Sequence, residues 1–335
     1  MTFSFATGPS LLVLRYIAFV TDLTEDAADT LRRWALDEGL KQRVLGNPAL
    51  ARAAAAVARR YTAGETVDDA VMAVRAVLHR GHEASIEYVG ESVRDPVLAR
   101  TETDVFLELA HVVAREAVPA TVSFDLSHVG SVVDRDLGLR HAQEIAKATE
   151  PLGQPLMISA EGSDRTDLVL GLYEELSHEY PHVGITLQAR LRRTPADLER
   201  VLRLPGRVRL VKGAFLEPEE IALRRGSTEL VEAYLTLARR LLQAGHPVSV
   251  ATHDELLVEA LVAEHGDLLK QQSVEFETLM GLGTELLDRL HRDGYRTREY
   301  VVFGGEWWLY VLNRIAEQPE RVITALADLN RVVRA

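Results

Sequence analysis

The octet VRLVKGAF, from Val208 to Phe215, gives the clearest indication of how this chain folds. Charged Arg209 and Lys212 among apolar residues would be unusual in a surface strand. They suit a buried barrel strand whose carboxyl end carries polar groups to a site, and we expect both cations to point towards an anion or an electron-rich ring. Gly213 has no Cβ, so the backbone there can approach a ligand closely. Taken alone, the octet fits equally well a core strand followed by a solvated lysine.

Short β-rich runs alternate with amphipathic helices from Glu83 onward, a pattern typical of a parallel sheet or barrel. The eight expected strands are 84–88, 120–126, 156–160, 184–189, 208–211, 248–251, 274–276 and 299–302. The expected helices are 101–116, 137–150, 166–180, 194–202, 227–244, 254–265, 284–294 and 307–318. We therefore predict an α/β fold, a (βα)8 barrel over residues 83–335 with an extra C-terminal helix. In such a barrel the active site lies at the carboxyl ends of the strands.

Residues 1–82 are expected to form an N-terminal helical arm. Apolar residues recur at helical spacing over 24–40, and 49–61 is rich in alanine, the residue with the highest helix propensity. Thr66 followed by Asp69 indicates a helix that begins at Val67. The chain of 335 residues is long enough for a barrel of about 250 residues together with this smaller part.

The composition excludes several classes of function. The chain contains no cysteine, which excludes disulfides, thiolate nucleophiles and cysteine-ligated metals. A formal net charge of −12 argues against a nucleic-acid partner, because binding to phosphates requires a concentrated basic surface. The apolar run 11–20 is too short to span a bilayer and contains Arg15, and no basic segment precedes it as in a signal peptide. We expect a cytoplasmic protein without a transmembrane segment.

Polar side chains follow the ends of all eight expected strands, and burying so many of them has a cost that a purely structural protein has little reason to bear. Some have simpler interpretations: Asp254 after His253 is a typical N-cap, and Glu161 is a candidate cap for the next helix. Asp125, His128 and Glu161 are metal-ligating types, but no pair has the helical spacing of a metal site, so no metal is expected. Rossmann and P-loop motifs do not occur in the sequence, so those nucleotide sites have no support.

Six segments resemble, in the same order, motifs of bacterial proline dehydrogenases, flavoenzymes that oxidise L-proline to pyrroline-5-carboxylate in a (βα)8 barrel. They are EGSDRT (161–166), LQARLRRT (187–194), RLVKGAF (209–215), ATHD (251–254), EFETLMGLG (275–283) and YVVFGGEWWLYVLNRIAEQP (300–319). The resemblance extends from about residue 60 to residue 319. A collinear series of this kind is far more specific than any one motif.

The resemblance implies FAD, held without a Rossmann unit. The residues that match the family's cofactor contacts are Ala160, Gln188, Arg209, Lys212, Gly213, Ala214, Thr252 and His253. Arg209 matches the arginine beside the reactive edge of the flavin, where a cation stabilises the negative charge of the reduced ring. Leu279 and Tyr300 match residues that enclose the substrate ring. An electron acceptor such as a quinone is implied by the resemblance.

Several positions depart from the family's pattern, above all in its clamp for the proline carboxylate. The substituted residues are Asp125 for a lysine, Ser159 for an aspartate, Phe215 for a tyrosine, Glu277 for a glutamine, and Asn313 before Arg314 for two consecutive arginines. Exchanging a lysine for Asp125 changes the local charge by two units. Losing one arginine removes charge-assisted bonding of roughly 1.5–3 kcal/mol. Tight binding of free L-proline is therefore not expected.

We hypothesise an FAD-dependent dehydrogenase that moves hydride from a carbon next to nitrogen onto the flavin. Its expected substrate is a proline-like amine or imine whose carboxylate is absent or masked, for example as an amide or a carrier-bound thioester. Asp125 is the first candidate for pairing with the substrate nitrogen or taking its proton, and Glu277 is the second. Tyr300 would shape the pocket, and Arg314 would hold a remaining acidic group. Two alternatives stay open: an ordinary L-proline dehydrogenase in which Asp125 and Ser159 have exchanged roles, and a non-catalytic flavin-binding barrel.

Overall fold

The computed structural model describes residues 26–90, 92–318, 321 and 323. Its contacts divide the chain into a barrel unit, Thr62–Gly305, and a helical unit, Met1–Tyr61 together with Glu306–Ala335. The apolar run at 11–20 lies outside the described residues. Along the described part of the chain, no helix has the length and apolar composition needed to cross a membrane. The expected division into an arm and a barrel at residue 82 stays a prediction.

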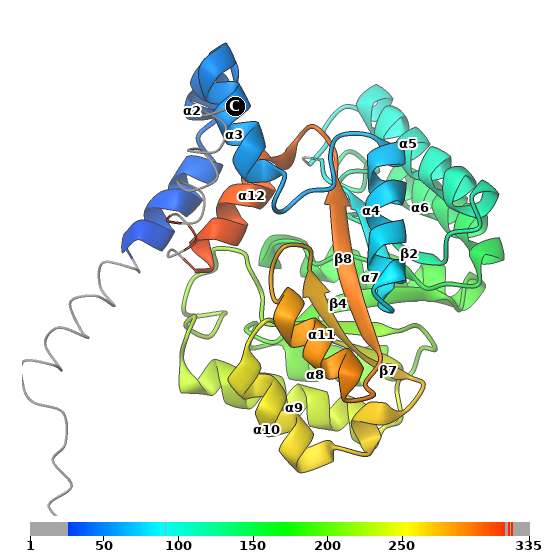
Figure 1. Cartoon of the computed structure of the whole chain (residues 1–335). Helices are drawn as coiled ribbons and strands as arrows, with labels where there is room; N and C mark the ends of the chain where they lie inside the picture. Colours follow the sequence, from blue (N-terminus) through cyan, green and yellow to red (C-terminus); the bar gives the residue numbers. More distant parts are fainter. Residues whose placement is uncertain (1–25, 91, 319–320, 322, 324–335) are drawn as a thin grey trace, which may run out of the picture. The chain divides into compact units, whose positions relative to one another are not determined.

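The barrel unit contains a closed barrel of eight parallel strands, which confirms the predicted fold (Figure 1). Consecutive strands pair with one another, and β1 closes the barrel against β8 with Ser85 opposite Tyr300. The strands are β1 (Glu83–Tyr88), β2 (Ala120–Phe124), β3 (Leu156–Ile158), β4 (Val183–Gln188), β5 (Val208–Val211), β6 (Val248–Ala251), β7 (Val274–Leu279) and β8 (Thr297–Phe303). The strands β2, β4 and β8 are buried at every residue, as expected of parallel strands covered by helices.

Helices follow the strands along the chain and cover the outside of the barrel. They are α5 (Pro96–Arg115), α6 (Arg135–Thr149), α7 (Thr166–Glu179), α8 (Thr194–Val201), α9 (Thr228–Gln243), α10 (Glu255–His265) and α11 (Thr284–Arg292), with short 3-10 helices η1 (Glu150–Leu152), η2 (Ser163–Arg165) and η3 (Leu268–Lys270). The helix α4 (Val67–His79) precedes β1 and lies along β8 and β1, as Figure 1 shows for β8. It therefore takes the place that a helix following β8 has in a regular (βα)8 barrel.

Short polar side chains begin several of these helices. Thr66 and Asp69 form a capping box at the start of α4, which confirms the predicted helix start at Val67. Asp254 caps α10 by accepting a hydrogen bond from the Leu257 amide at 3.1 Å, so the cap interpretation of Asp254 is correct. The cap proposed for Glu161 is wrong: α7 has no side-chain cap, and Glu161 accepts hydrogen bonds from the Ser127 amide and from Arg165.

The helical unit contains a helix at 26–35, α2 (Glu38–Leu45), α3 (Pro48–Ala58) and α12 (Trp307–Ala316). The single helical segment expected over 24–40 is interrupted at 36–37, because Asp37 adopts an extended conformation and caps α2. Within this unit the Trp308 indole donates a hydrogen bond to the Trp34 carbonyl at 3.0 Å. Lys41 pairs with Glu306 at 2.5 Å.

Charged and hydroxyl side chains contact one another near the amino-terminal ends of the strands, and we call this group the lower ion layer: Glu83, Thr121, Arg207, Ser249, Glu275 and Arg298. Arg298 donates to both Glu275 carboxylate oxygens at 2.8 and 3.2 Å and to the Thr121 hydroxyl at 3.0 Å. It also pairs with Glu83. Burial alone would raise the pKa of Glu275, but Arg298 and Arg207 outweigh it and lower the pKa to about 2. Each charge of this layer is therefore matched by a partner.

Candidate active site

The centre of the candidate site is a buried ion pair between β5 and β7. Arg209 donates to the two Glu277 carboxylate oxygens, at 2.7 Å from Nε and 3.0 Å from Nη2. Both side chains are almost fully buried, and the bidentate geometry is the strongest that arginine makes with a carboxylate. Arg209 thus points towards an anion, as expected from the sequence, but that anion belongs to the protein.

Two hydroxyls and an aromatic ring complete the surroundings of Arg209. Its Nη2 donates to Ser123 at 3.1 Å and to Ser85 at 3.3 Å, and Ser85 in turn donates to Glu277 at 2.9 Å. The guanidinium carbon lies 4.6 Å from the centre of the Tyr300 ring, within the range of a cation–π contact. Arg209, Glu277, Ser85 and Ser123 are called the upper ion layer below.

One layer further towards the carboxyl ends of the strands, Glu87 lies beside Ser159. Inward-facing residues alternate along a strand, so Glu87 follows Ser85 on the inner face of β1. The Ser159 hydroxyl donates to Glu87 Oε2 at 2.7 Å, and the Tyr300 hydroxyl lies 3.4 Å from Ser159 Oγ. Burial, together with negative Asp125, raises the pKa of Glu87 to about 8, although Ser159, Arg209 and His128 each favour its ionised form.

Asp125 follows β2 and supplies the second acid of this region; Glu87 and Asp125 are the mouth acids. Its Oδ2 lies 3.3 Å from His128 Nε2. Burial and the nearby Glu161 raise the pKa of Asp125 well above its usual range, against the opposing effect of Arg165. Burial lowers the pKa of His128, so this imidazole favours its neutral form near neutral pH. The mouth of the barrel is thus acidic, in contrast to the matched lower ion layer.

The residues expected to hold a flavin lie along β5 and at the ends of β3, β4, β5 and β6. Gln188 Oε1 is buried and has no hydrogen-bond partner among the described residues, while its Nε2 donates to the Glu161 carbonyl at 2.8 Å. Gly213 has φ +111°, and a Cβ at this position would lie 2.8 Å from Arg190 Cγ and 3.0 Å from Gln188 Oε1. An unsatisfied acceptor beside a backbone position that tolerates no side chain fits a planar, hydrogen-bonding ligand.

The remaining expected cofactor contacts are held by neighbours. Lys212 Nζ pairs with Asp254 Oδ2 at 2.5 Å, so the second cation of the octet is not simply solvated. The Leu279 amide donates to His253 Nε2 at 3.0 Å, and Thr252 Oγ1 accepts from the Asp254 amide at 3.1 Å. These bonds fix the turn between β6 and α10.

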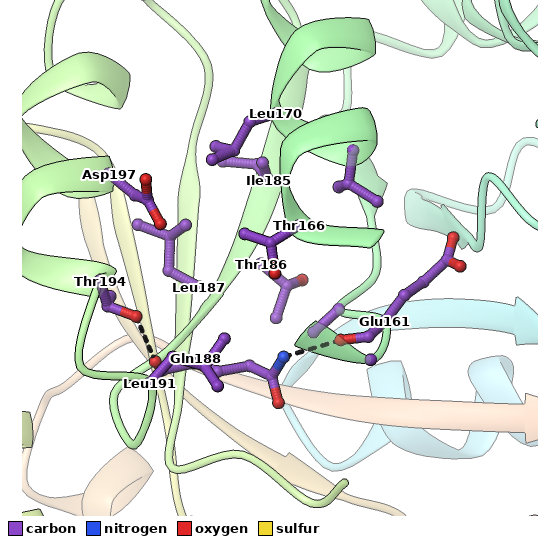
Figure 2. Close-up of a pocket in the computed structure, with 13 residues that line it drawn as sticks. Glu161, Thr166, Leu170, Ile185, Thr186, Leu187, Gln188, Leu191, Thr194 and Asp197 are labelled. Atoms are coloured by element: carbon purple, nitrogen blue, oxygen red, sulfur yellow. Dashed lines mark hydrogen bonds between the residues drawn. The ribbon is translucent and has the colours of Figure 1, made fainter. Parts of the chain in front are cut away.

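A small pocket lies beside this cradle, on the outer side of β4. Its thirteen lining residues come from the end of β3, from α7, from β4 and from α8, and include Ala160 and Gln188 (Figure 2). Figure 2 also shows the hydrogen bonds from Gln188 to Glu161 and from Thr194 to the Gln188 carbonyl. The pocket's volume of about 30 Å³ admits water-sized molecules and not a flavin ring.

Three predicted site residues are not among the groups described so far. Phe215 is 40% exposed, and its carbonyl and that of Ala214 accept hydrogen bonds from Arg225. Asn313 and Arg314 lie on α12 in the helical unit, where Arg314 pairs with Glu317 at 2.9 Å. Among the residues that the structure describes, no group of three or more His, Asp and Glu side chains could hold a metal ion.

Sequence reasoning missed Glu87, Ser85 and Ser123. All three lie within the expected strands, whereas the candidate site residues were sought mainly at the strand ends. The available signal was the polar alternation of S-I-E in β1 (85–87), since a strand buried on both faces seldom carries polar residues at every second position.

Comparison with known proteins gives consistent matches. A family model described as proline dehydrogenase matches residues 70–307. The chain is 32% identical over 271 residues to a proline dehydrogenase of Deinococcus radiodurans, covering 78% of this chain and 86% of that protein. It is 30% identical over 277 residues to proline dehydrogenase 1 of Bacillus subtilis (strain 168), covering 81% of this chain and 90% of that protein.

A similar fold occurs among solved structures. Proline utilization A (PutA) from Bdellovibrio bacteriovorus matches with a TM-score of 0.73 and 20% identity over 89% of this chain. The match covers 37% of the PutA chain, so the present chain spans little more than a third of that protein. At this identity the likeness concerns the fold alone.

Proposed function

The chain belongs to the proline dehydrogenase family, whose members are flavin-dependent oxidoreductases acting on CH–NH groups. From this premise we propose that it is an FAD-dependent dehydrogenase of a proline-like cyclic amine or imine whose carboxylate is absent or masked. Converting the carboxylate to an amide or to a carrier-bound thioester keeps the ring and removes the negative charge of the carboxylate. A small-molecule electron acceptor such as a quinone would reoxidise the flavin.

The observation that carries the substrate class is the charge at the mouth of the barrel. Asp125 stands where the resemblance implies a lysine, and Glu87 is a second acid beside it. The buried cation that acts on Glu87, Arg209, is already paired with Glu277. A free carboxylate finds no unpaired buried cation here and is repelled whenever either acid is ionised, whereas a protonated amine is attracted to the pair and favours its ionised form.

FAD is proposed as the cofactor on the residues at the ends of β3, β4, β5 and β6. The unsatisfied Gln188 Oε1 and the side-chain-free backbone at Gly213 fit a hydrogen-bonding ring system. Ala160, Lys212, Ala214, Thr252 and His253 are the further candidate contacts. When bound, the flavin would supply the two-electron oxidation of the C–N bond. The protein's own task is to bind the amine, orient it and accept its proton.

Ordinary L-proline oxidation is the second candidate, and the identity to curated proline dehydrogenases favours it. In that case a rearranged mouth would still hold the carboxylate. The two candidates differ in the sign of the charge that the site prefers next to the reacting ring.

A substrate panel with an artificial electron acceptor tests the proposal. We expect the FAD-loaded protein to oxidise pyrrolidine and L-prolinamide with a kcat/KM at least tenfold above that for L-proline. A higher kcat/KM for L-proline than for both neutral analogues would reject the masked-carboxylate substrate in favour of the second candidate. A protein whose visible spectrum contains no flavin after incubation with FAD and gel filtration would reject both.

A further inference from the structure

Glu87 has no role in the function proposed above beyond its charge, yet its surroundings are those of a reacting group. The side chain is 8% exposed, so it lies at the boundary between the packed interior and the mouth. Ser159 donates to one of its oxygens at 2.7 Å. Ser159 is in turn 3.4 Å from the hydroxyl of Tyr300, whose ring contacts Arg209.

The other two acids considered for proton transfer are less suited to it. Glu277 accepts three hydrogen bonds, two from Arg209 Nε and Nη2 and one from the Ser85 hydroxyl. Taking a proton onto Glu277 would leave Arg209 as an uncompensated buried cation, which is costly. Asp125 faces His128 at 3.3 Å and lies close to Glu161, so its environment favours structural pairing.

The groups that face Glu87 come from four sides and set its proton affinity. Negative Asp125 from the end of β2 raises its pKa, whereas Arg209 from β5, His128 from the segment after β2 and the Ser159 hydroxyl from the end of β3 lower it. Burial is the largest effect and favours the neutral acid. The Tyr300 hydroxyl from β8 reaches this group through Ser159. A base of this kind is poised near the pH at which an enzyme works.

We propose that Glu87 is the catalytic residue that pairs with the protonated nitrogen of the amine substrate and takes its proton, with Ser159 as the hydroxyl that orients the carboxylate. This inference rests on the proposed function. One N–H bond of the secondary ammonium breaks, the proton goes to a Glu87 oxygen, and the electron pair stays on nitrogen. That pair then forms the C=N bond as the hydride leaves the neighbouring carbon, for which the flavin of the proposed function would be the acceptor. Asp125 contributes by attracting the cation and by keeping the proton affinity of Glu87 high.

The first test needs no substrate and compares infrared spectra of wild type, Glu87→Gln, Ser159→Ala, Asp125→Asn and the control Glu199→Gln. Glu199 pairs with Arg240 between exposed helices, so its variant matches the chemical change away from the site. We expect a protonated-carboxyl band in wild type that disappears around pH 8 and is absent from E87Q, distinct from the band of Asp125, whose pKa is also raised and which should be absent from D125N. Its midpoint should move to higher pH in S159A, which loses a donor to the carboxylate, and to lower pH in D125N, which loses a negative neighbour. It should be unchanged in E199Q.

The second test measures binding of pyrrolidine by calorimetry at about pH 7 in buffers of different ionisation enthalpy. Wild type is expected to release a proton when the ammonium binds, and E87Q is expected to release none and to bind at least tenfold more weakly. The rate constant for flavin reduction by pyrrolidine should fall about 100-fold in E87Q, the usual scale of a lost general base. A thermal unfolding curve of E87Q shows whether this variant folds. The S159A variant keeps the carboxyl group, so a change in proton release in S159A tests the orienting role of Ser159 separately.

The outcomes distinguish this inference from the function on which it rests. A band with its midpoint near pH 8 that persists in E87Q, or equal pyrrolidine affinity and proton release in E87Q and wild type, overturns the assignment of Glu87 even if amines reduce the flavin. Failure of wild type to bind pyrrolidine also overturns it. If the band and the proton release behave as expected but no amine reduces the flavin, the proton site at Glu87 stands and the proposed dehydrogenase function fails.

Discussion

The lower ion layer and the mouth acids are both made of buried carboxylates inside the same barrel, yet their proton affinities are shifted in opposite directions. Arg298 and Arg207 lower the pKa of Glu275 to about 2, while burial and Asp125 raise that of Glu87 to about 8. The position along the barrel explains the difference: Glu275 on β7 lies beside Arg207, which precedes β5, and Arg298 of β8, whereas Glu87 on β1 lies near another acid, Asp125. Carboxylates paired with cations stabilise the fold, whereas a buried acid without a cationic partner has a perturbed pKa that suits proton transfer.

The largest expected effect comes from breaking the matched layer. Glu275→Gln leaves Arg298 with its Glu83 partner but without the bidentate carboxylate at 2.8 and 3.2 Å. We expect a loss of roughly 3–5 kcal/mol in the free energy of unfolding, since one partner of a buried pair is removed. Urea unfolding followed by circular dichroism measures it. A loss below about 1 kcal/mol would show that the lower ion layer does not act as a matched unit.

Removing the charge of a mouth acid should raise the free energy of unfolding, in contrast to the loss expected for the lower ion layer. Glu87→Gln is expected to stabilise the protein by roughly 2–4 kcal/mol at about pH 8, because the neutral amide avoids the cost of a carboxyl whose pKa is raised. A raised folded-state pKa means that the contribution of wild-type Glu87 is most favourable below its unfolded pKa of about 4.5 and is lost as the pH rises through about 8. The stability difference between E87Q and wild type should therefore grow over that interval. A difference independent of pH would contradict the raised pKa.

The free energy of unfolding at acidic pH should depend on the lower ion layer. Glu275 has a lowered pKa, so its contribution is present above its unfolded value of about 4.5 and is lost as the pH falls towards 2. The stability of wild type should fall over this interval more steeply than that of E275Q. Parallel curves for the two proteins would remove Glu275 as the cause.

Reversing the charge of one mouth acid tests whether the acidic mouth sets the substrate preference. Asp125→Lys places a cation beside Glu87, and we expect the KM for L-proline to fall at least tenfold while that for pyrrolidine rises. Asp125→Asn should shift both values less, which separates charge from shape. An unchanged KM for L-proline in D125K would mean that residue 125 lies far from the carboxylate of bound L-proline.

The smallest expected effect concerns the layer between the two regions. Ser123→Ala removes one hydroxyl acceptor from Arg209 but leaves its two bonds to Glu277. We expect a loss of about 1 kcal/mol in stability, the usual net worth of one such hydrogen bond. The apparent pKa of the Glu87 band should move little. A shift as large as that in D125N would show that the upper ion layer, and not the mouth, controls Glu87.

Much of the fold could be predicted from the sequence, because barrel strands and helices leave local patterns. All eight strands were expected within a few residues of their observed positions, and the caps at Thr66 and Asp254 follow from local hydrogen bonding. The pairing of Arg209 with Glu277 could not be predicted, since it depends on which inward-facing side chains of β5 and β7 share a level of the barrel. Glu87 was missed for a related reason: its significance depends on Ser159 and Asp125, which are distant in sequence. The break at Asp37 was missed because helical periodicity continues across it.

The most direct measurement is an anaerobic titration of the FAD-loaded protein, in parallel, with L-proline and with L-prolinamide, following the visible flavin band. The acidic mouth predicts that L-prolinamide bleaches the band at a concentration at least tenfold below that required of L-proline. If L-proline bleaches the band at equal or lower concentration, the mouth accepts a carboxylate. The proposed substrate class would then be contradicted, and the protein would be an ordinary proline dehydrogenase.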